Sequence, residues 1–432
     1  LFFTLAPASA ADKPNVIVIV GDDMGYADVG VHGCKDIPTP NLDALANAGV
    51  RFTSGYVSGP YCSPTRAGLL TGRYQTRFGH EFNPAGMAQG LPLTETTIAD
   101  RMKAAGYATG WVGKWHLGGG DRHPQKRGFD EAFGFLGGAH SYFPDKGKGD
   151  TVLRGTKDAN ETEYLTDAFG REAVAFVDKN KAKPFFLYLA FNAVHTPMHA
   201  TDARLKKFEG IKDTQRRTYA AMMFAMDEAV GKVLDKLKSE KLDQNTLIFF
   251  FSDNGGPTMQ GTTLNGSINA PLRGSKRTTL EGGVRVPFFA RWPAQIPANK
   301  VYEHPVIQLD IAPTVFAATG IGPKVDWKLD GVNLLPHLTG QSKEPPHDAL
   351  YWRFGTQMAI RKGDWKLVKY DLAAESGKGT SDTKLYNLAN DIGEKSDLAA
   401  KQPEKVKELQ GAWGTWNKGN VAPLWGGGKA KD

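Results

Sequence analysis

The sequence predicts an α/β fold in which a large, mostly parallel sheet lies between two layers of helices. Continuous apolar runs rich in β-branched and aromatic residues recur along the chain, as expected for strands buried on both faces. Segments with helical periodicity separate these runs. An alternation of strands and helices is typical of an open sheet covered by helices on both sides.

Four apolar runs are the expected strands of this sheet. They are "NVIVIV" at 15–20, "YATGWVG" at 107–113, "FFLYLAFN" at 185–192 and "TLIFFFSDN" at 246–254. Helices are predicted between them, at 39–49, 96–106, 161–179 and 214–240. In the first helix Thr39 is the expected N-cap, Pro40 the first helical residue and Gly49 the C-cap. The second is expected to end at Gly106.

The composition changes after about residue 340, and this change predicts a domain boundary. The segment 341–348, "QSKEPPHD", is polar and proline-rich, as linkers are. Short alternating segments follow, which predicts an antiparallel sheet and then a helix near 402–413. We therefore expect a main domain at 11–345 and a smaller α+β subdomain at 346–432.

Charge and the N-terminal segment indicate the compartment and the kind of partner. The 432 residues carry a formal net charge of +7, which favours anionic partners. Nucleic acid is not expected, because no nucleic-acid-binding motif accompanies the charge. Residues 1–10, "LFFTLAPASA", are typical of the end of a secretory signal peptide and predict export to the periplasm or the extracellular space. No later run is long enough to predict a membrane span.

Acidic and amide side chains follow two of the predicted strands. Asp22 and Asp23 come after 15–20, and Asp253 and Asn254 come after the run "LIFFFS". The carboxyl ends of strands are where ligands bind in open α/β sheets, and such oxygen ligands suit Ca²⁺ or Mg²⁺. Each cluster alone is more typical of a turn, but their occurrence after two buried strands favours one metal site.

One of the two cysteines, Cys62, precedes Ser-Pro-Thr-Arg and a short apolar run. Pro64 fits the first turn of a helix, so Cys62 is expected at a helix N-terminus, where anions bind and thiol pKa values fall. The residues therefore predict a nucleophile beside an anion site, with Arg66 one turn away. The alternative is a buried, inert thiol.

These motifs together resemble the formylglycine-dependent sulfatases of the alkaline-phosphatase-like superfamily. Cys62-Ser63-Pro64-Thr65-Arg66 followed by "AGLLTG" resembles the signature of that family. Similar blocks occur in the family's order over about residues 13–340: "NVIVIVGDDMGYADVG", "TPNLDALANAGVRFTSGY", "GYATGWVGKWHLG", "FNAVHTP", "FFFSDNGG" and "LRGSKRTTLEGGVRVP". The resemblance implies hydrolysis of sulfate esters in an alkaline-phosphatase-like fold.

The resemblance also implies a modified nucleophile. A maturation enzyme that generates formylglycine would oxidise Cys62 to Cα-formylglycine. One hydroxyl of the hydrated aldehyde would bind a divalent cation, with Ca²⁺ favoured over Mg²⁺, and the other would attack sulfur. The implied ligands of the cation are Asp22, Asp23, Cys62, Asp253 and Asn254. A disulfide between Cys34 and Cys62 would compete with this modification, so we expect Cys34 to be unpaired.

The resemblance implies catalytic roles for three basic residues and two histidines. Arg66 and Lys114 would hold the hydrated aldehyde. Lys276 and His195 would face the sulfate and the leaving oxygen, with His195 as the first choice of general acid, and His116 would be the base that releases sulfate. Taken singly, exposed lysines and buried histidines are commonplace.

The expected substrate is a sulfated saccharide, and the residues expected to contact it lie in loops, where specificity often resides. They are His80, Glu81, Asn83, Arg127, His140, Tyr142, Trp352 and Arg353. Arg277, where the family commonly has a small residue, adds positive charge beside the sulfate pocket. The alternatives are a phosphatase or phosphonate monoester hydrolase of the same superfamily, or a non-catalytic binder of sulfated glycans in which Cys62 stays unmodified.

Overall fold

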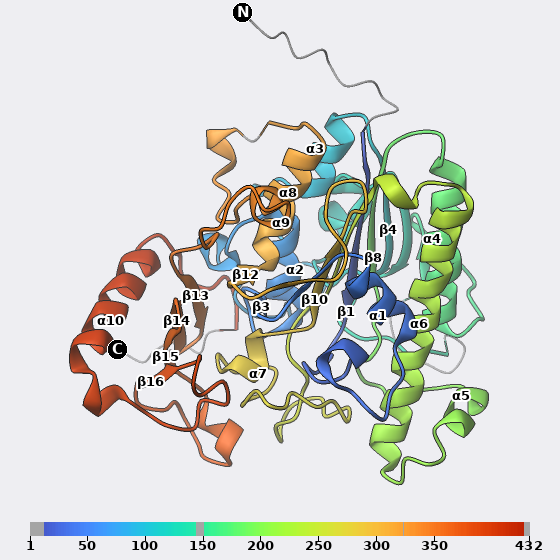
Figure 1. Ribbon diagram of the computed structural model, residues 1–432. Helices are drawn as coiled ribbons and strands as arrows, with labels where there is room; N and C mark the ends of the chain where they lie inside the picture. The colour runs from blue at the N-terminus through green and yellow to red at the C-terminus, as the bar shows by residue number, and fades with distance from the viewer. Residues whose placement is uncertain (1–12, 144–150, 323, 427–432) are drawn as a thin grey trace, which may run out of the picture.

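The computed structural model describes residues 13–143, 151–322 and 324–426 (Figure 1). The predicted signal-peptide remnant, residues 1–10, lies outside these residues. None of the described helices combines the length and the apolarity needed to cross a membrane.

A ten-stranded mixed sheet forms the centre of the molecule (Figure 1). Five neighbouring strands, β9, β1, β8, β4 and β5, are parallel, while β10 runs antiparallel to both β9 and β2. The expected α/β sheet is therefore confirmed, with antiparallel strands toward its edges. In spatial order the strands are β11 (Lys300–Tyr302), β2 (Val50–Phe52), β10 (Phe288–Arg291), β9 (Thr246–Ser252), β1 (Asn15–Gly21), β8 (Phe185–Ala190), β4 (Ala108–Lys114), β5 (Glu131–Phe135), β6 (Leu153–Arg154) and β7 (Lys157–Asp158).

The register of the two central strands places their carboxyl ends side by side. Every residue of β1 and of β9 is buried, which explains why their sequences are apolar on both faces. Gly21, the last residue of β1, pairs with Ser252, the last residue of β9. The amide of Asp253 then donates to the carbonyl of Gly21 at 3.0 Å. The acidic residues that follow the two strands are consequently neighbours.

Helices cover both faces of the sheet (Figure 1). The helices on one face are α1 (Pro40–Asn47), α4 (Leu165–Asn180), α5 (Asp202–Lys207) and α6 (Thr214–Ser239). The helices on the other face are α2 (Cys62–Thr71), α3 (Ile98–Ala104), α8 (Ile311–Ala318) and α9 (Leu335–Leu338). Each layer packs on the strand residues that point toward it, as the alternation of side chains along a strand requires.

The first helix ends earlier than predicted. Its C-cap is Ala48, and Gly49 lies beyond the helix at a conformation open to any residue. Gly49 is required for a different reason, since a Cβ at this position would lie 2.1 Å from the carbonyl oxygen of Ala290 on β10. The predicted end of α3 is close to the observed one, with Gly106 left-handed at φ +87° just after Ala105.

A second, antiparallel sheet forms the C-terminal subdomain, as predicted (Figure 1). It contains β13 (Leu350–Phe354), β14 (Gln357–Lys362), β15 (Trp365–Lys369) and β16 (Lys384–Asn387), and α10 (Pro403–Asn417) packs on it. Two short strands, β3 (Gly55–Tyr56) and β12 (Val306–Ile307), pair elsewhere. The fully buried Trp352 packs on Tyr56 and donates from Nε1 to the carbonyl of Val57 at 2.7 Å, so the two domains share a core.

A group of buried charges lies where the domains meet, and we call it the interdomain cluster: Arg285, Arg361, Lys366, Glu281 of α7 (Glu281–Val284) and Glu394. Lys366 Nζ is 2.8 Å from a carboxylate oxygen of Glu281 and 3.0 Å from one of Glu394. Burial and the nearby charge of Glu281 raise the pKa of Glu394 to about 7, against the attraction of Lys366.

Candidate active site

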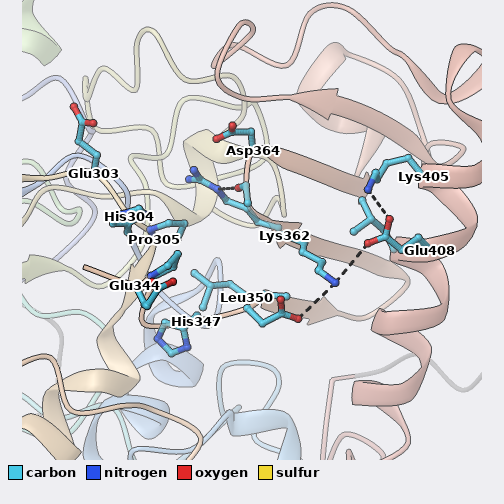
Figure 2. A pocket seen from close by; sticks show the side chains of 16 residues that line it. Glu303, His304, Pro305, Glu344, His347, Leu350, Lys362, Asp364, Lys405 and Glu408 are labelled. Atoms are coloured by element: carbon cyan, nitrogen blue, oxygen red, sulfur yellow. Dashed lines mark hydrogen bonds and ion pairs between the residues drawn. The ribbon is translucent and has the colours of Figure 1, made fainter. Parts of the chain in front are cut away.

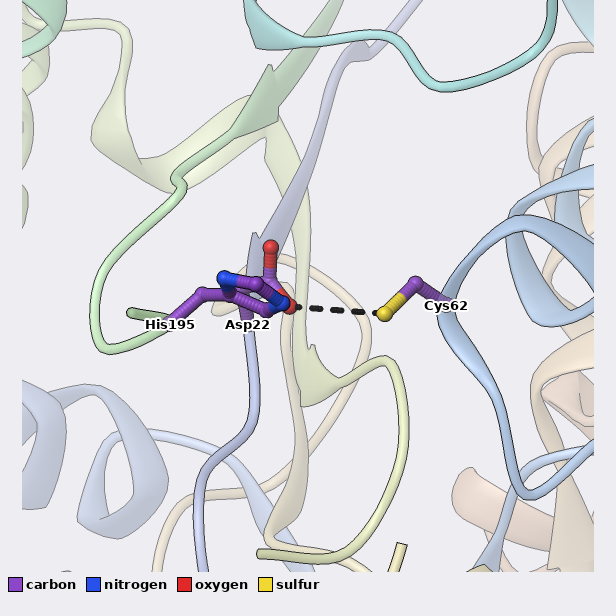
Figure 3. Close-up of side chains that lie close together, drawn as sticks. All are labelled: Asp22, Cys62 and His195. Carbon is purple, nitrogen blue, oxygen red and sulfur yellow. Dashed lines mark hydrogen bonds between the residues drawn. The ribbon is translucent and has the colours of Figure 1, made fainter. Parts of the chain in front are cut away.

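Four ligating side chains converge at the carboxyl ends of β1 and β9. The ligand atoms of Asp22, Asp23, Asp253 and Cys62 all lie within 4.8 Å of one another, and all four residues are buried. Cys62 is the first residue of α2, and its Sγ donates to Asp22 Oδ1 at 3.8 Å. Figure 3 shows the thiol pointing from α2 toward Asp22, with the ring of His195 beside the carboxylate. The two acidic clusters and the cysteine predicted from sequence thus form one site.

Asn254 offers a further oxygen that fits a metal ion. Its Nδ2 donates to Asp23 Oδ1 at 2.7 Å and to the carbonyl of Gly255 at 3.0 Å. Its Oδ1 is buried and has no hydrogen-bond partner. A buried oxygen of this kind normally has a partner. Beside three carboxylates it fits a hard divalent cation such as Ca²⁺ or Mg²⁺.

Three buried cations balance the three carboxylates. Together these six residues form what we call the site floor: Asp22, Asp23, Asp253, Arg66, Lys114 and Lys276. Arg66 donates twice to Asp253 Oδ2, at 3.0 and 2.8 Å, from a position one turn into α2. Lys114, the last residue of β4, donates to Asp22, and Lys276 donates to Asp23 at 2.8 Å.

The floor cations keep the carboxylates ionised. Burial alone would raise the pKa of Asp22, but Lys114, His195 and Arg66 outweigh it and hold that pKa below its usual value. The pKa of Asp23 is likewise lowered, because Lys276 and His195 overcome its burial. Anionic carboxylates are the form that binds a metal ion.

The thiol of Cys62 does not have the low pKa expected at a helix N-terminus. Burial raises its pKa to about 12, although Lys114 and Lys276 act in the opposite direction, and the carboxylates of Asp253 and Asp22 raise it further. The expectation neglected the burial of the thiol, which is the main reason for the raised pKa. Cys62 is therefore a protonated donor to Asp22 and a poor thiolate nucleophile.

Both predicted catalytic histidines reach the site. His195 donates from Nδ1 to the carbonyl of Thr196 at 2.6 Å, and its Nε2 lies 3.6 Å from Asp23 Oδ2. His116 has a left-handed backbone, φ +58°, and its ring lies against Gly138, where a Cβ would be 2.5 Å from Nε2. Burial lowers the pKa of both rings, helped by Lys114 at His116 and by Lys276 at His195. At His195 the carboxylates of Asp23 and Asp22 act against this shift.

A cavity of 470 Å³ opens above the floor. The residues that line it are Tyr61, Asn83, Pro84, His116, Gly138, Ala139, His195, Gly261, Thr262, Thr263, Lys276 and Arg277. None of these residues is an aspartate or a glutamate, so the charged side chains of its wall are cationic. A second cavity of 440 Å³ shares Pro84, His116, Gly138 and Ala139 with it.

The predicted substrate residues are only partly on this wall. Asn83 lines the cavity, and its Oδ1 also accepts from the amide of Ser63, in the first turn of α2, at 3.0 Å. His80 is fully buried and bonds through Nε2 to Ser63 Oγ at 2.6 Å. Glu81 is buried in an ion pair with Arg353, 2.7 Å long. His80, Glu81 and Arg353 are therefore not on the wall: His80 holds the loop to α2, and the Glu81–Arg353 pair holds it to the C-terminal subdomain.

The other predicted contacts are also parts of the framework. His140 is buried with Nδ1 2.7 Å from the carbonyl of Ser141. Arg127 donates to the carbonyls of Leu91, Pro92 and Glu95. Tyr142 supports the His195 loop by donating to its carbonyl at 2.9 Å, and Trp352 is part of the core. Sequence reasoning missed two residues of the wall, Tyr61 and Thr263. The only sequence feature that could have indicated them is that Tyr61 is next to Cys62 and that Thr263 follows Asp253 and Asn254 along the chain.

Both cysteines are free thiols, as the expected modification of Cys62 requires. Cys34 is half-buried and donates to Asp36 Oδ1 at 3.3 Å, whereas Cys62 donates to Asp22. Each thiol therefore has its own carboxylate partner.

A larger cavity, of 740 Å³, lies elsewhere, between the linker, β14 and α10 (Figure 2). Several of its charged side chains pair with one another: Lys362 with Asp348 and Glu408, and Lys405 with Glu408. No group of three metal-ligating side chains was found there within the described part of the chain. Size alone does not make it the reactive site.

Comparison with known proteins gives a consistent result. The family described as "Sulfatase" matches residues 14–321, and "N-sulphoglucosamine sulphohydrolase, C-terminal" matches residues 274–411. The N-acetylgalactosamine-6-sulfatase of Canis lupus familiaris is 35% identical over 84% of this chain and 73% of its own length. Arylsulfatase G of Rattus norvegicus is 32% identical over 93% and 86%. The crystal structure of Ps i-CgsB in complex with k-i-k-neocarrahexaose is 40% identical, with a TM-score of 0.89 over 97% of this chain and 96% of that one.

Proposed function

The chain belongs to the sulfatase family and is a sulfuric ester hydrolase, and from this premise we propose that it cleaves sulfate esters of saccharides with a formylglycine made from Cys62. The observation that carries the proposal is the position of Cys62. It starts α2 above three convergent carboxylates, and its pKa of about 12 makes the unmodified thiol a poor nucleophile. A maturation enzyme would supply the missing reactivity by oxidising this side chain.

The modified residue would supply one hydroxyl that attacks sulfur and displaces the leaving oxygen, and loss of the proton from its second hydroxyl would then expel sulfate and restore the aldehyde. In this arrangement the Arg66 guanidinium and the Lys114 ammonium hold position 62 from two sides, since both pair with carboxylates next to its side chain. The Lys276 ammonium, buried beside the cavity, offers its positive charge to the sulfate oxygens.

The two histidines would provide the proton transfers. His195 Nδ1 is committed to the carbonyl of Thr196, so Nε2 faces the site and would protonate the leaving oxygen from the imidazolium form, which the carboxylates of Asp23 and Asp22 favour. His116 lines both cavities and acts as the base that releases sulfate from position 62. The lowered pKa of His116 suits its role as a neutral base.

One divalent cation completes the proposed site. Asp22, Asp23, Asp253 and Asn254 would hold it together with position 62, and the unpartnered Oδ1 of Asn254 supports this assignment. When bound, it would stabilise negative charge on the sulfate and on the nucleophile. The donor set consists of oxygen atoms, which both Ca²⁺ and Mg²⁺ accept. Of the two ions, we propose Ca²⁺ ahead of Mg²⁺.

The substrate proposal rests on the cavity and the relatives together. The cationic wall suits an anionic ester, and a curated relative is named for N-acetylgalactosamine 6-sulfate chemistry. A similar solved structure holds a neocarrahexaose. We also propose that the protein is exported, on the signal-like pattern of residues 1–10.

Activity on 4-nitrophenyl sulfate and 4-nitrophenyl phosphate tests the proposal, using protein whose position 62 has been examined by peptide mass spectrometry. We expect an aldehyde mass at residue 62 and faster cleavage of the sulfate ester. Much faster phosphate hydrolysis would instead identify a phosphatase or a phosphonate monoester hydrolase. An unmodified thiol in protein from the native host, with no turnover, would identify a non-catalytic binder of sulfated glycans.

A further inference from the structure

Arg277 differs from the other basic side chains of the site because it has no acid partner. Lys276, its neighbour, pairs with Asp23, whereas the Arg277 guanidinium donates from Nη1 to the carbonyl of Gly261 at 3.2 Å. Within the described ranges, no carboxylate lies at ion-pair distance from it. Arg277 is half-buried and lines the cavity above the floor. It is thus a cation available to a ligand.

The backbone fixes this side chain at a conformational cost. Arg277 has φ +72°, in the left-handed region that glycine adopts without strain. Its amide donates to the carbonyl of Pro60 at 2.7 Å, and its carbonyl accepts from Nε2 of Gln357 on β14 at 2.8 Å. Strained positions that the surroundings enforce are found mainly at functional sites. Two hydrogen bonds therefore fix the backbone that carries the guanidinium to the cavity.

We propose that Arg277 is a specificity residue that binds a second anionic group of the substrate. The preferred substrates are then saccharides that carry another sulfate or a carboxylate close to the scissile sulfate. This inference rests on the proposed function, because it assumes that a sulfate ester occupies the same cavity.

The distribution of charge supports a second anion. The three floor carboxylates are matched by the three floor cations, so those cations are already engaged with the protein. The cavity wall has no acidic side chain that would repel an anion. A planar guanidinium can also bind a sulfate or a carboxylate with two parallel hydrogen bonds.

Steady-state kinetics on matched substrates test this proposal. The substrates are 4-nitrophenyl sulfate, a monosulfated disaccharide, the same disaccharide with a second sulfate, and its uronate-containing analogue. We expect Arg277→Ala to lower kcat/KM by about 10- to 100-fold on the substrates with a second anionic group, as loss of a charge-assisted hydrogen bond does. On the singly charged substrates we expect a change below about threefold. The two doubly charged saccharides distinguish a second sulfate from a carboxylate.

Three further variants distinguish the effect of losing the Arg277 charge from the effect of changing the local structure. Arg277→Gly removes the charge and relieves the backbone strain, and should match Arg277→Ala in kinetics. Arg277→Lys should keep part of the preference, and Arg217→Ala, which removes a half-buried arginine of α6, should change nothing. An equal loss on all substrates, or no loss on any, would overturn the proposal. If the unaltered chain cleaves no sulfate ester, the proposed function fails, and calorimetric binding of the disulfated disaccharide to the chain and to Arg277→Ala still decides the role of Arg277.

Discussion

The site floor and the interdomain cluster are two buried groups of ion-paired side chains with different arrangements. In the interdomain cluster, Lys366 lies between the carboxylates of Glu281 and Glu394 and separates them. In the floor, the carboxylates of Asp22, Asp23 and Asp253 lie close to one another, and each pairs with its own cation. In the interdomain cluster a lysine joins the two carboxylates, whereas in the floor the carboxylates converge with Cys62 as a set of metal-ligating atoms.

This difference shows that burial and charge do not by themselves mark a reactive site. Both clusters contain fully buried lysines and carboxylates with shifted pKa values. The floor differs in that the buried Asn254 Oδ1 beside it has no polar partner at all, whereas Glu394 Oε1, which also lacks a hydrogen bond, lies 3.0 Å from Lys366 Nζ. Mutations should therefore affect activity at the floor and stability in the interdomain cluster.

The largest effect is expected at position 62. Cys62→Ala removes the precursor of the nucleophile, so kcat on 4-nitrophenyl sulfate should fall by at least about 10⁴-fold. The chain offers a matched control in its other cysteine, since Cys34→Ala removes a thiol bonded to Asp36 away from the site. Activity retained by Cys62→Ala, or lost by Cys34→Ala, would contradict the assignment of the nucleophile.

Two fully buried lysines provide the sharpest test of the comparison. Lys366→Met leaves Glu281 and Glu394 without their shared cation, and should lower the free energy of unfolding by about 3–5 kcal/mol. Its kcat/KM in the folded state should stay within about threefold of that of the unaltered chain, because no floor residue is changed. Chemical denaturation and aryl sulfate hydrolysis measure the two quantities.

The substitution at the site floor that corresponds to Lys366→Met is Lys114→Met. It should lower kcat/KM by at least about 100-fold through loss of the charge that holds position 62. Its effect on unfolding should be smaller than that of Lys366→Met, because Arg66 remains 3.4 Å from Asp22. If both variants lost stability and activity in the same proportion, the two clusters would not have separate roles.

The sequence predicted the floor far better than the cavity wall, and the reason is physical. Asp22, Asp253 and Lys114 follow or end strands whose apolar composition reveals them, and parallel strands bring their ends to one edge. The wall is built from loops, whose paths depend on long-range contacts such as that of Gln357 with Arg277. His80 and Glu81 were predicted to touch substrate, because nothing in the sequence shows that they face inward.

The C-terminal subdomain illustrates the same limit. Its alternating strands β13–β16 were predicted from pattern alone, since a half-buried antiparallel sheet shows a period of two. Its role in holding the loop that carries Lys276 was not predicted. That role depends on single contacts between distant segments, such as the amide of Thr279 with Gln357 Oε1 at 3.1 Å.

The interdomain cluster should also impose a pH dependence on stability. The pKa of Glu394 is raised from an ordinary 4.5 to about 7, so the folded state binds its proton more tightly than the unfolded state does. Its stabilising contribution is complete below pH 4.5 and is lost as the pH rises to about 7. The loss is on the order of 1–3 kcal/mol. The free energy of unfolding of the chain should therefore fall across this range relative to that of Glu394→Gln.

The test of Glu394 is how the difference in unfolding free energy between the two proteins changes with pH, and not the size of that difference at any one pH. The substituted amide changes the contacts with Lys366 and the amide of Glu281 by an amount that does not vary between pH 4.5 and 7. Denaturation curves of both proteins at several pH values give the difference directly. A constant difference across this range would show that Glu394 is ionised throughout.

The smallest effect is expected at Asn83, where the wall meets the floor. Its Oδ1 accepts from the Ser63 amide in the first turn of α2, so Asn83→Ala should lower the free energy of unfolding by about 1 kcal/mol. Asn83→Asp keeps the acceptor and should retain that stability, but it introduces a carboxylate into a wall that has none. Its KM for sulfate esters should therefore rise severalfold, by repulsion. Equal KM values for Asn83→Asp and the unaltered chain would show that the side chain acts only on α2, while equal losses of stability in both variants would show that the cap contributes nothing.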